Sequence, residues 1–156
     1  MISIDTNILF PACDRSAAFH EMAVRFLSGI SRHQGVCICE QVLIELYGLL
    51  RNPTVNRHPL SAVKAHETIQ TFRENPNWKI VDVIQDGNHM NEFWQRAADP
   101  HFPYRRIFDL RLAMTLRQHQ VDEFVTRNLK DFQDFGFKKV WDPFAGTAPG
   151  TGGQAL

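Results

Sequence analysis

The chain has 156 residues, of which 44% are hydrophobic and 22% are charged, a balance that suits one globular domain. Lysine and arginine total 17, and aspartate and glutamate also total 17, so the net charge is zero and any contact with nucleic acid must rely on locally clustered cations. There is no charged leader before a short apolar stretch and no apolar run near roughly 18 residues, which argues against secretion and membrane spanning. We therefore expect a cytoplasmic protein.

Apolar residues follow strand and helix periodicities in alternation along the chain. Strands are expected at 2–4, 36–39, 78–83, 123–126 and 138–141, and helices near 8–12, at 16–32, around Glu45, at 60–74, at 88–97 and around Asp109. This alternation predicts an α/β fold with helices on both faces of a mainly parallel sheet. One domain is expected over 1–143, and the Gly/Pro-rich segment 144–156 is expected to be a flexible tail.

Cysteine and histidine do not predict a metal site. Cys37 and Cys39 lie in the expected strand VCIC, and with Cys13 they make three thiols without further spaced ligands. Buried thiols are the expected outcome. The seven histidines show no HxH or HExxH spacing.

Asp5 is the most informative residue, because it ends the alternating run Met-Ile-Ser-Ile with a carboxylate. Ligands of open α/β sheets lie at the carboxyl ends of strands, which is where this side chain is expected. Thr6 and Asn7 follow, and either could bond to a neighbouring carboxylate or cap a helix that begins at Ile8. Asp5 could also be a simple turn or capping residue.

Two further acids occupy places where the pattern disfavours acids. Glu45 is on the flank of an apolar helical stripe that contains Val42 and Leu49, and Asp109 lies within the stripe of its own helix, three residues before Leu112. An unpaired carboxylate is costly to bury. Taken singly, Glu45 could be a surface acid and Asp109 a favourable first-turn acid. Together with Asp5 they suit Mg²⁺, which is typically held by one or two carboxylates, waters and a substrate phosphate.

Around these three acids the chain resembles the PIN-domain family, specifically the VapC-type ribonuclease toxins of bacterial toxin–antitoxin pairs. The matching segments are ISIDTNILF, QVLIELYGLL, RRIFDLRLAMTLRQHQ, FVTRNLKDF and GFKKVWDP, which together run from Met1 to about Pro143. The resemblance implies a three-layer α/β/α sandwich that clusters Asp5, Glu45 and Asp109 around Mg²⁺ or Mn²⁺ and cleaves RNA. It also implies a VapB-type antitoxin partner, for which the helices between about Ser16 and Glu74 offer an apolar groove, and a homodimer.

One position departs from the family pattern. Many members carry a fourth acid two residues after the threonine of the TRN-like segment, and this chain has Asn128 there. Asp131, three residues later, is the other candidate for a fourth metal contact, although it could equally close a turn. Both readings stay open at the level of the sequence.

Cations gather in sequence around the expected site: Arg105 and Arg106 precede Asp109, and Arg127 lies in the TRN-like segment. Arginine can hold a phosphate with two donors at once, and Arg105 and Arg106 are the preferred RNA phosphate contacts.

Two other functions fit parts of the pattern. A catalytically silent PIN-fold module that binds RNA or protein is favoured by the loss of the acid at position 128. An aspartyl-nucleophile phosphatase also begins with a strand ending in Asp-Xaa-Asp, but the third position of that motif is Asn7, which cannot act as its general acid.

Overall fold

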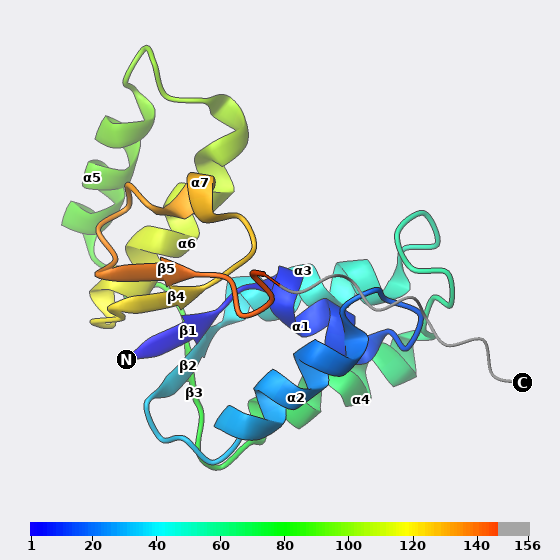
Figure 1. Ribbon diagram of the computed structural model, residues 1–156. Helices are drawn as coiled ribbons and strands as arrows, with labels where there is room; N and C mark the ends of the chain where they lie inside the picture. The colour runs from blue at the N-terminus through cyan, green and yellow to red at the C-terminus, as the bar shows by residue number, and fades with distance from the viewer. Residues whose placement is uncertain (147–156) are drawn as a thin grey trace, which may run out of the picture.

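The computed structural model describes residues 1–146 and places a five-stranded parallel sheet at the centre of the molecule (Figure 1). Its strands are β1 (Ile2–Ile4), β2 (Val36–Cys39), β3 (Lys79–Val81), β4 (Glu123–Val125) and β5 (Lys139–Trp141), in the spatial order β3-β2-β1-β4-β5. Every neighbouring pair is parallel. All four residues of β2 are buried, as expected for an inner strand covered on both faces.

The helices form two outer layers. They are α1 (Thr6–Cys13), α2 (His20–Ile30), α3 (Glu40–Arg51), α4 (Ala62–Arg73), α5 (Gly87–Ala97), α6 (Ile107–Gln118) and α7 (Leu129–Phe132), with a short 3₁₀ turn, η1 (Tyr104–Arg106), before α6. The crossovers place α1 to α4 on one face and α5 to α7 on the other, which Figure 1 shows as two groups of ribbons on either side of the sheet. The predicted α/β/α sandwich is confirmed.

The strand order reverses between β1 and β4. From β1 the chain moves outward through β2 to β3, then crosses back over the sheet to β4 and continues outward to β5. Such a reversal opens a crevice at the carboxyl ends of the two central strands. Asp5 follows β1 and Thr126 follows β4, so both residues lie at this crevice.

Three local features differ from the sequence predictions. Helix α1 begins at Thr6 instead of Ile8, because Asp5 itself is the N-cap and accepts a hydrogen bond from the Thr6 amide. The turns η1 and α7 were not predicted, since each is a single short turn within a polar segment. The predicted tail begins too early: Phe144 is buried, with its ring 5.4 Å from that of Phe19. The rest of the predicted tail, 147–156, lies outside the described residues.

Two other expectations can be compared with the structure. Cys37 and Cys39 are buried free thiols, as predicted, and Cys13 is partly buried. Within the described part of the chain, no helix is long and apolar enough to cross a membrane.

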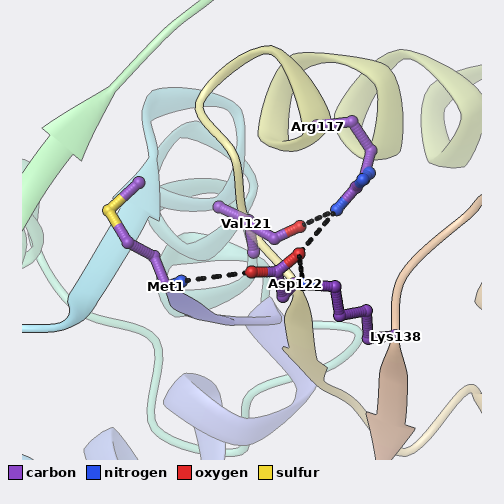
Figure 2. A network of polar contacts seen from close by, with 5 residues as sticks. All are labelled: Met1, Arg117, Val121, Asp122 and Lys138. Atoms are coloured by element: carbon purple, nitrogen blue, oxygen red, sulfur yellow. Dashed lines mark hydrogen bonds and ion pairs between the residues drawn. The ribbon is translucent and has the colours of Figure 1, made fainter.

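At the amino ends of the strands, charges form a compact network around Asp122 (Figure 2). Its carboxylate lies 3.2 Å from Lys138 Nζ, 3.4 Å from Arg117 Nη1 and 3.9 Å from the amino group of Met1. Arg117 also donates to the Val121 carbonyl at 2.5 Å. These bonds, chiefly the one from Lys138, hold the pKa of Asp122 below its usual value. The network connects β1, the end of α6 and the segment before β5.

Candidate active site

Asp5 is held at the strand reversal by three hydrogen bonds. One carboxylate oxygen accepts from the Thr6 amide at 2.7 Å, and the other accepts from Asn7 Nδ2 at 2.7 Å and from Thr126 Oγ1 at 2.5 Å. The side chain is buried, with 7% of the residue exposed. Burial raises the pKa of Asp5 to about 6, and repulsion from Glu45 and Asp109 adds to this, while the Thr126 and Thr6 hydrogen bonds oppose it.

The small polar residues around Asp5 connect it to its neighbours. Thr6 Oγ1 lies 3.0 Å from Glu45 Oε2, to which it can donate, so one threonine joins two of the predicted acids. Asn7 Nδ2 also donates to Thr126 Oγ1 at 3.0 Å, and Thr126 Oγ1 accepts from the backbone amide of Asn128 at 3.0 Å. The structure therefore brings Thr6, Asn7 and Asn128 to the position expected for supporting residues.

Thr126 is a site residue that the sequence prediction missed as such. In the sequence it only marks the TRN-like segment, yet in the structure it is fully buried and donates a hydrogen bond directly to Asp5. The available signal was positional: Thr126 ends a predicted strand as Asp5 does, and β1 and β4 pair so that Ile4 lies beside Val125. Only the strand order, which the sequence did not supply, makes the two residues neighbours.

Asp109 lies in the first turn of α6 and is partly buried. Burial raises its pKa, and repulsion from Asp131 adds to the increase, while Arg106 lowers it. Glu45 also contributes to the repulsion, although its own side chain on α3 is exposed. The three acids thus come from three separate elements and influence one another electrostatically.

All three acids line one cavity of about 870 Å³. Asn7 and Asn128 line it too, together with three arginines, Arg105, Arg111 and Arg127. Asp131 is not among the lining residues; its carboxylate lies 4.0 Å from Arg106 Nε. Within residues 1–146, no three carboxylate, imidazole or thiolate side chains are close enough to hold one ion between them. The donor set still fits Mg²⁺, which needs only one or two carboxylates beside waters and phosphate.

The structure separates the two predicted phosphate contacts. Arg105 is exposed and lines the cavity, and its Nε donates to the Tyr104 hydroxyl at 3.0 Å. Arg106 does not line this cavity. It pairs with Asp134 through Nη2 at 2.6 Å, donates to the Asp131 carbonyl at 2.5 Å and stacks on Phe135 at 4.5 Å. Arg106 therefore connects the start of α6 to the segment around α7.

This separation predicts opposite effects for two matched substitutions. Arg105→Met should weaken RNA binding and reduce its dependence on salt, because a phosphate contact releases counterions, while the melting temperature stays unchanged. Arg106→Met should instead lower the free energy of unfolding by on the order of 1–2 kcal/mol, since it removes the ion pair with Asp134 and also the hydrogen bond to the Asp131 carbonyl. Filter-binding titrations at several salt concentrations and thermal melts check both effects. Equal stability of the two variants would contradict the assignment of Arg106.

The comparisons with known proteins agree with this fold. No protein-family model matches the chain. Ribonuclease VapC24 of Mycobacterium tuberculosis is 51% identical over 143 residues, which cover 92% of this chain and 97% of that protein. Ribonuclease VapC48 of the same organism is 27% identical over 149 residues, covering 92% of this chain and 98% of that protein.

Solved structures share the fold at low sequence identity. Mycobacterium tuberculosis VapC20, described as a toxin that cleaves the sarcin–ricin loop, has a TM-score of 0.63 at 17% identity, covering 88% of this chain and 96% of its own. FitAcB from Neisseria gonorrhoeae has a TM-score of 0.62 at 18% identity, covering 93% and 99%. The similarity to VapC24 extends over nearly the whole length of both proteins and confirms the predicted family. The chain belongs to the VapC family of PIN-domain ribonucleases, the toxins of VapBC toxin–antitoxin systems.

Proposed function

We propose that this ribonuclease is a Mg²⁺- or Mn²⁺-dependent endonuclease in which Asp5, Asp109 and Glu45 hold the metal. The observation that supports this most is the convergence of the three acids on one cavity from β1, α3 and α6. When bound, such a cation activates water and offsets the charge of the scissile phosphate. The predicted hard-cation chemistry agrees with the absence of histidine and cysteine from the cavity lining in the described chain.

The residues of the chain have separate tasks in this proposal. Asp5 is held rigidly by Thr6, Asn7 and Thr126, so its carboxylate points to the cavity in one fixed orientation. Asn128 supplies a neutral oxygen on the β4 side of the cavity. Arg105 binds an RNA phosphate, and the cation supplies the positive charge that the net-neutral chain lacks.

The first test is metal dependence. The purified protein should cleave single-stranded RNA with Mg²⁺ or Mn²⁺ and lose this activity in excess EDTA, because the carboxylates alone supply no Lewis acid. Activity should return when Mn²⁺ is added beyond the chelator. Undiminished cleavage in EDTA would refute the metal assignment.

The second test concerns the fourth oxygen ligand. Asn128 lines the cavity and Asp131 does not, so Asn128→Asp should tighten Mn²⁺ binding and lower the stability of the metal-free protein through added repulsion. Asp131→Asn should change Mn²⁺ affinity less, because Asp131 acts on Asp109 through its charge alone. Calorimetric titration of Mn²⁺ into both variants decides between them. A larger loss of Mn²⁺ affinity for Asp131→Asn than for Asp5→Asn would make Asp131 a direct metal ligand.

We also propose that a VapB-type antitoxin restrains the enzyme and that the toxin forms a homodimer. Exposed apolar side chains on α2, α3 and α4 support a protein-binding surface. Val24, Ile44 and Val63 are 41%, 70% and 65% exposed. These residues lie within the segment from Ser16 to Glu74 where the antitoxin groove was predicted. Solved structures with the same fold include VapBC2 from Rickettsia felis bound to a promoter DNA fragment, at a TM-score of 0.55, 16% identity and coverage of 91% of this chain and 98% of its own.

A further inference from the structure

The cavity of the three acids keeps its positive and negative charges apart. Arg105, Arg111 and Arg127 line it beside Asp5, Glu45, Asp82 and Asp109. Yet none of these three arginines forms an ion pair with a carboxylate anywhere in residues 1–146. Opposite charges that share a cavity without neutralising one another suit a ligand that brings both signs, such as a cation with a polyanion.

The lining residues follow the carboxyl edge of the sheet in a definite order. Asp82 comes after β3, Gln41 after β2, Asp5 after β1 and Arg127 after β4, and these strands are consecutive in the sheet. Neighbouring strands are about 4.8 Å apart. The lining of the cavity therefore spans the ends of four consecutive strands, and Asp5 lies between Asp82 and Arg127 in this order.

Arg111 is held on the β2 side of Asp5. Its Nη1 donates to Gln41 Oε1 at 2.9 Å, and Gln41 Nε2 in turn donates to the Phe108 carbonyl at 2.9 Å. The amide of Gln41 fixes the guanidinium group without neutralising it. Asp82, which follows β3, forms no ion pair with Arg111, and its carboxylate accepts from the Val83 amide at 2.8 Å.

Arg127 is held on the opposite side, toward β4 and β5. Its guanidinium lies 4.1 Å from the centre of the Phe19 ring, and that ring stacks on Phe144, which follows β5. Its backbone amide donates to Asn7 Oδ1 at 3.1 Å. An aromatic face orients this second arginine, again without a neutralising carboxylate.

We propose that Arg111 and Arg127 form two phosphate-binding subsites on opposite sides of the metal-binding acids, so that RNA runs along the carboxyl edge of the sheet. This rests on the proposed function. The scissile phosphate lies over Asp5 and Asp109, Arg111 binds a phosphate on one side of it, and Arg127 binds a phosphate on the other. The ligand of each subsite is a phosphodiester group of single-stranded RNA, recognised by charge and independent of base identity.

The test uses a short single-stranded RNA that carries one mapped cleavage site. Its phosphates are replaced one at a time by neutral methylphosphonates, and binding is measured in EDTA so that no cleavage occurs. For the wild type, a replacement at either flanking subsite should weaken binding about tenfold, as expected for a charge-assisted hydrogen bond. Arg111→Met should bind the unmodified RNA about tenfold more weakly and become insensitive to phosphate replacement on one side of the cleavage site. Arg127→Met should become insensitive on the other side.

Two further variants serve as controls. Lys138→Met also removes one positive charge, but from the exposed amino edge of the sheet, and it should keep the full wild-type sensitivity at every phosphate. Gln41→Glu gives Arg111 a carboxylate partner and should reproduce the phosphate profile of Arg111→Met. This second variant tests the subsite even if Arg111→Met fails to fold, as judged by thermal melts.

The outcomes separate this inference from the proposed function. Two results would overturn the two-subsite arrangement and leave the proposed function standing. In both, the wild type cleaves RNA with metal, while Arg111→Met and Arg127→Met either lose sensitivity to replacement of the same phosphate or keep sensitivity at every phosphate. Loss of antitoxin binding in Arg111→Met with unchanged RNA binding would assign Arg111 to the protein partner and overturn it as well. A wild-type protein that neither binds nor cleaves RNA would overturn both proposals.

Discussion

Asp109→Asn is expected to lower the RNA cleavage rate by more than about a hundredfold, since even partners of metal ligands contribute 10- to 100-fold. The same variant should melt at a higher temperature than the wild type when no metal is present. Burial and the charge of Asp131 raise the pKa of Asp109, so its ionised form destabilises the folded protein at neutral pH. No hydrogen bond of the Asp109 carboxylate is found in the described residues, so the amide removes the repulsion from Asp131 and Glu45 without breaking a hydrogen bond. Cleavage assays and metal-free thermal melts measure the two effects.

Glu67→Gln is the matched control for this substitution. It also replaces an ionised acid on a helix by its amide, but Glu67 is exposed on α4 and pairs with Lys64 away from the cavity. Cleavage should be unchanged, and stability should change little, as for most surface ion pairs. If Asp109→Asn melted below the wild type, its loss of activity would reflect damage to the fold, and the metal role of Asp109 would lose its support.

The stability of the metal-free protein is expected to fall as the pH rises from about 4 to about 6. The pKa of Asp5 is raised from 3.8 to about 6, so in this interval the folded protein binds a proton that the unfolded chain has released. Stability from this group is fully present below pH 4 and is lost through pH 6. A shift of this size corresponds to an effect on the order of 3 kcal/mol. Urea unfolding in EDTA across this pH range measures it.

Saturating Mn²⁺ should reverse the sign of this pH dependence. The metal binds the ionised carboxylate, so its affinity should rise with pH through the same interval, and the stabilisation by metal should rise with it. Asp5→Asn is the control, because it has no proton to release at this position and should lose the part of both slopes that comes from Asp5. If the free energy of unfolding changed with pH in the same way with and without Mn²⁺, Asp5 would not contact the metal.

Asp5 and Asp109 could be singled out in the sequence because each one breaks a local pattern. Asp5 ends an apolar strand, and Asp109 interrupts the apolar face of a helix, so burial of each could be inferred from its near neighbours. The alternation of strands and helices likewise predicted the α/β fold. Such signals extend over a few residues only, which is why they can be read without knowledge of the tertiary structure.

What could not be predicted depends on contacts between distant parts of the chain. The Asp5–Thr126 hydrogen bond joins residues 121 positions apart and requires that β1 and β4 be neighbours. Arg105 and Arg106 are identical in type and adjacent in sequence, yet only the fold places Asp134 beside the second of them. Phe144 looked like the start of a tail because its partner, Phe19, comes from the other end of the chain.

The Asp122 network has a consequence for how the molecule tolerates change. At the amino ends of the strands, one carboxylate is surrounded by three cationic groups, whereas at the carboxyl ends Asp5, Glu45 and Asp109 form no ion pair within the described residues. Helix α6 joins the two regions, with Asp109 in its first turn and Arg117 in its last. Substitutions of Asp122 should therefore shorten the lifetime of the protein in the cell without altering its chemistry, and substitutions of Asp109 should remove the chemistry without shortening that lifetime. A screen for variants that lose toxicity would find both kinds, and the abundance of each variant would assign it to one end of this helix.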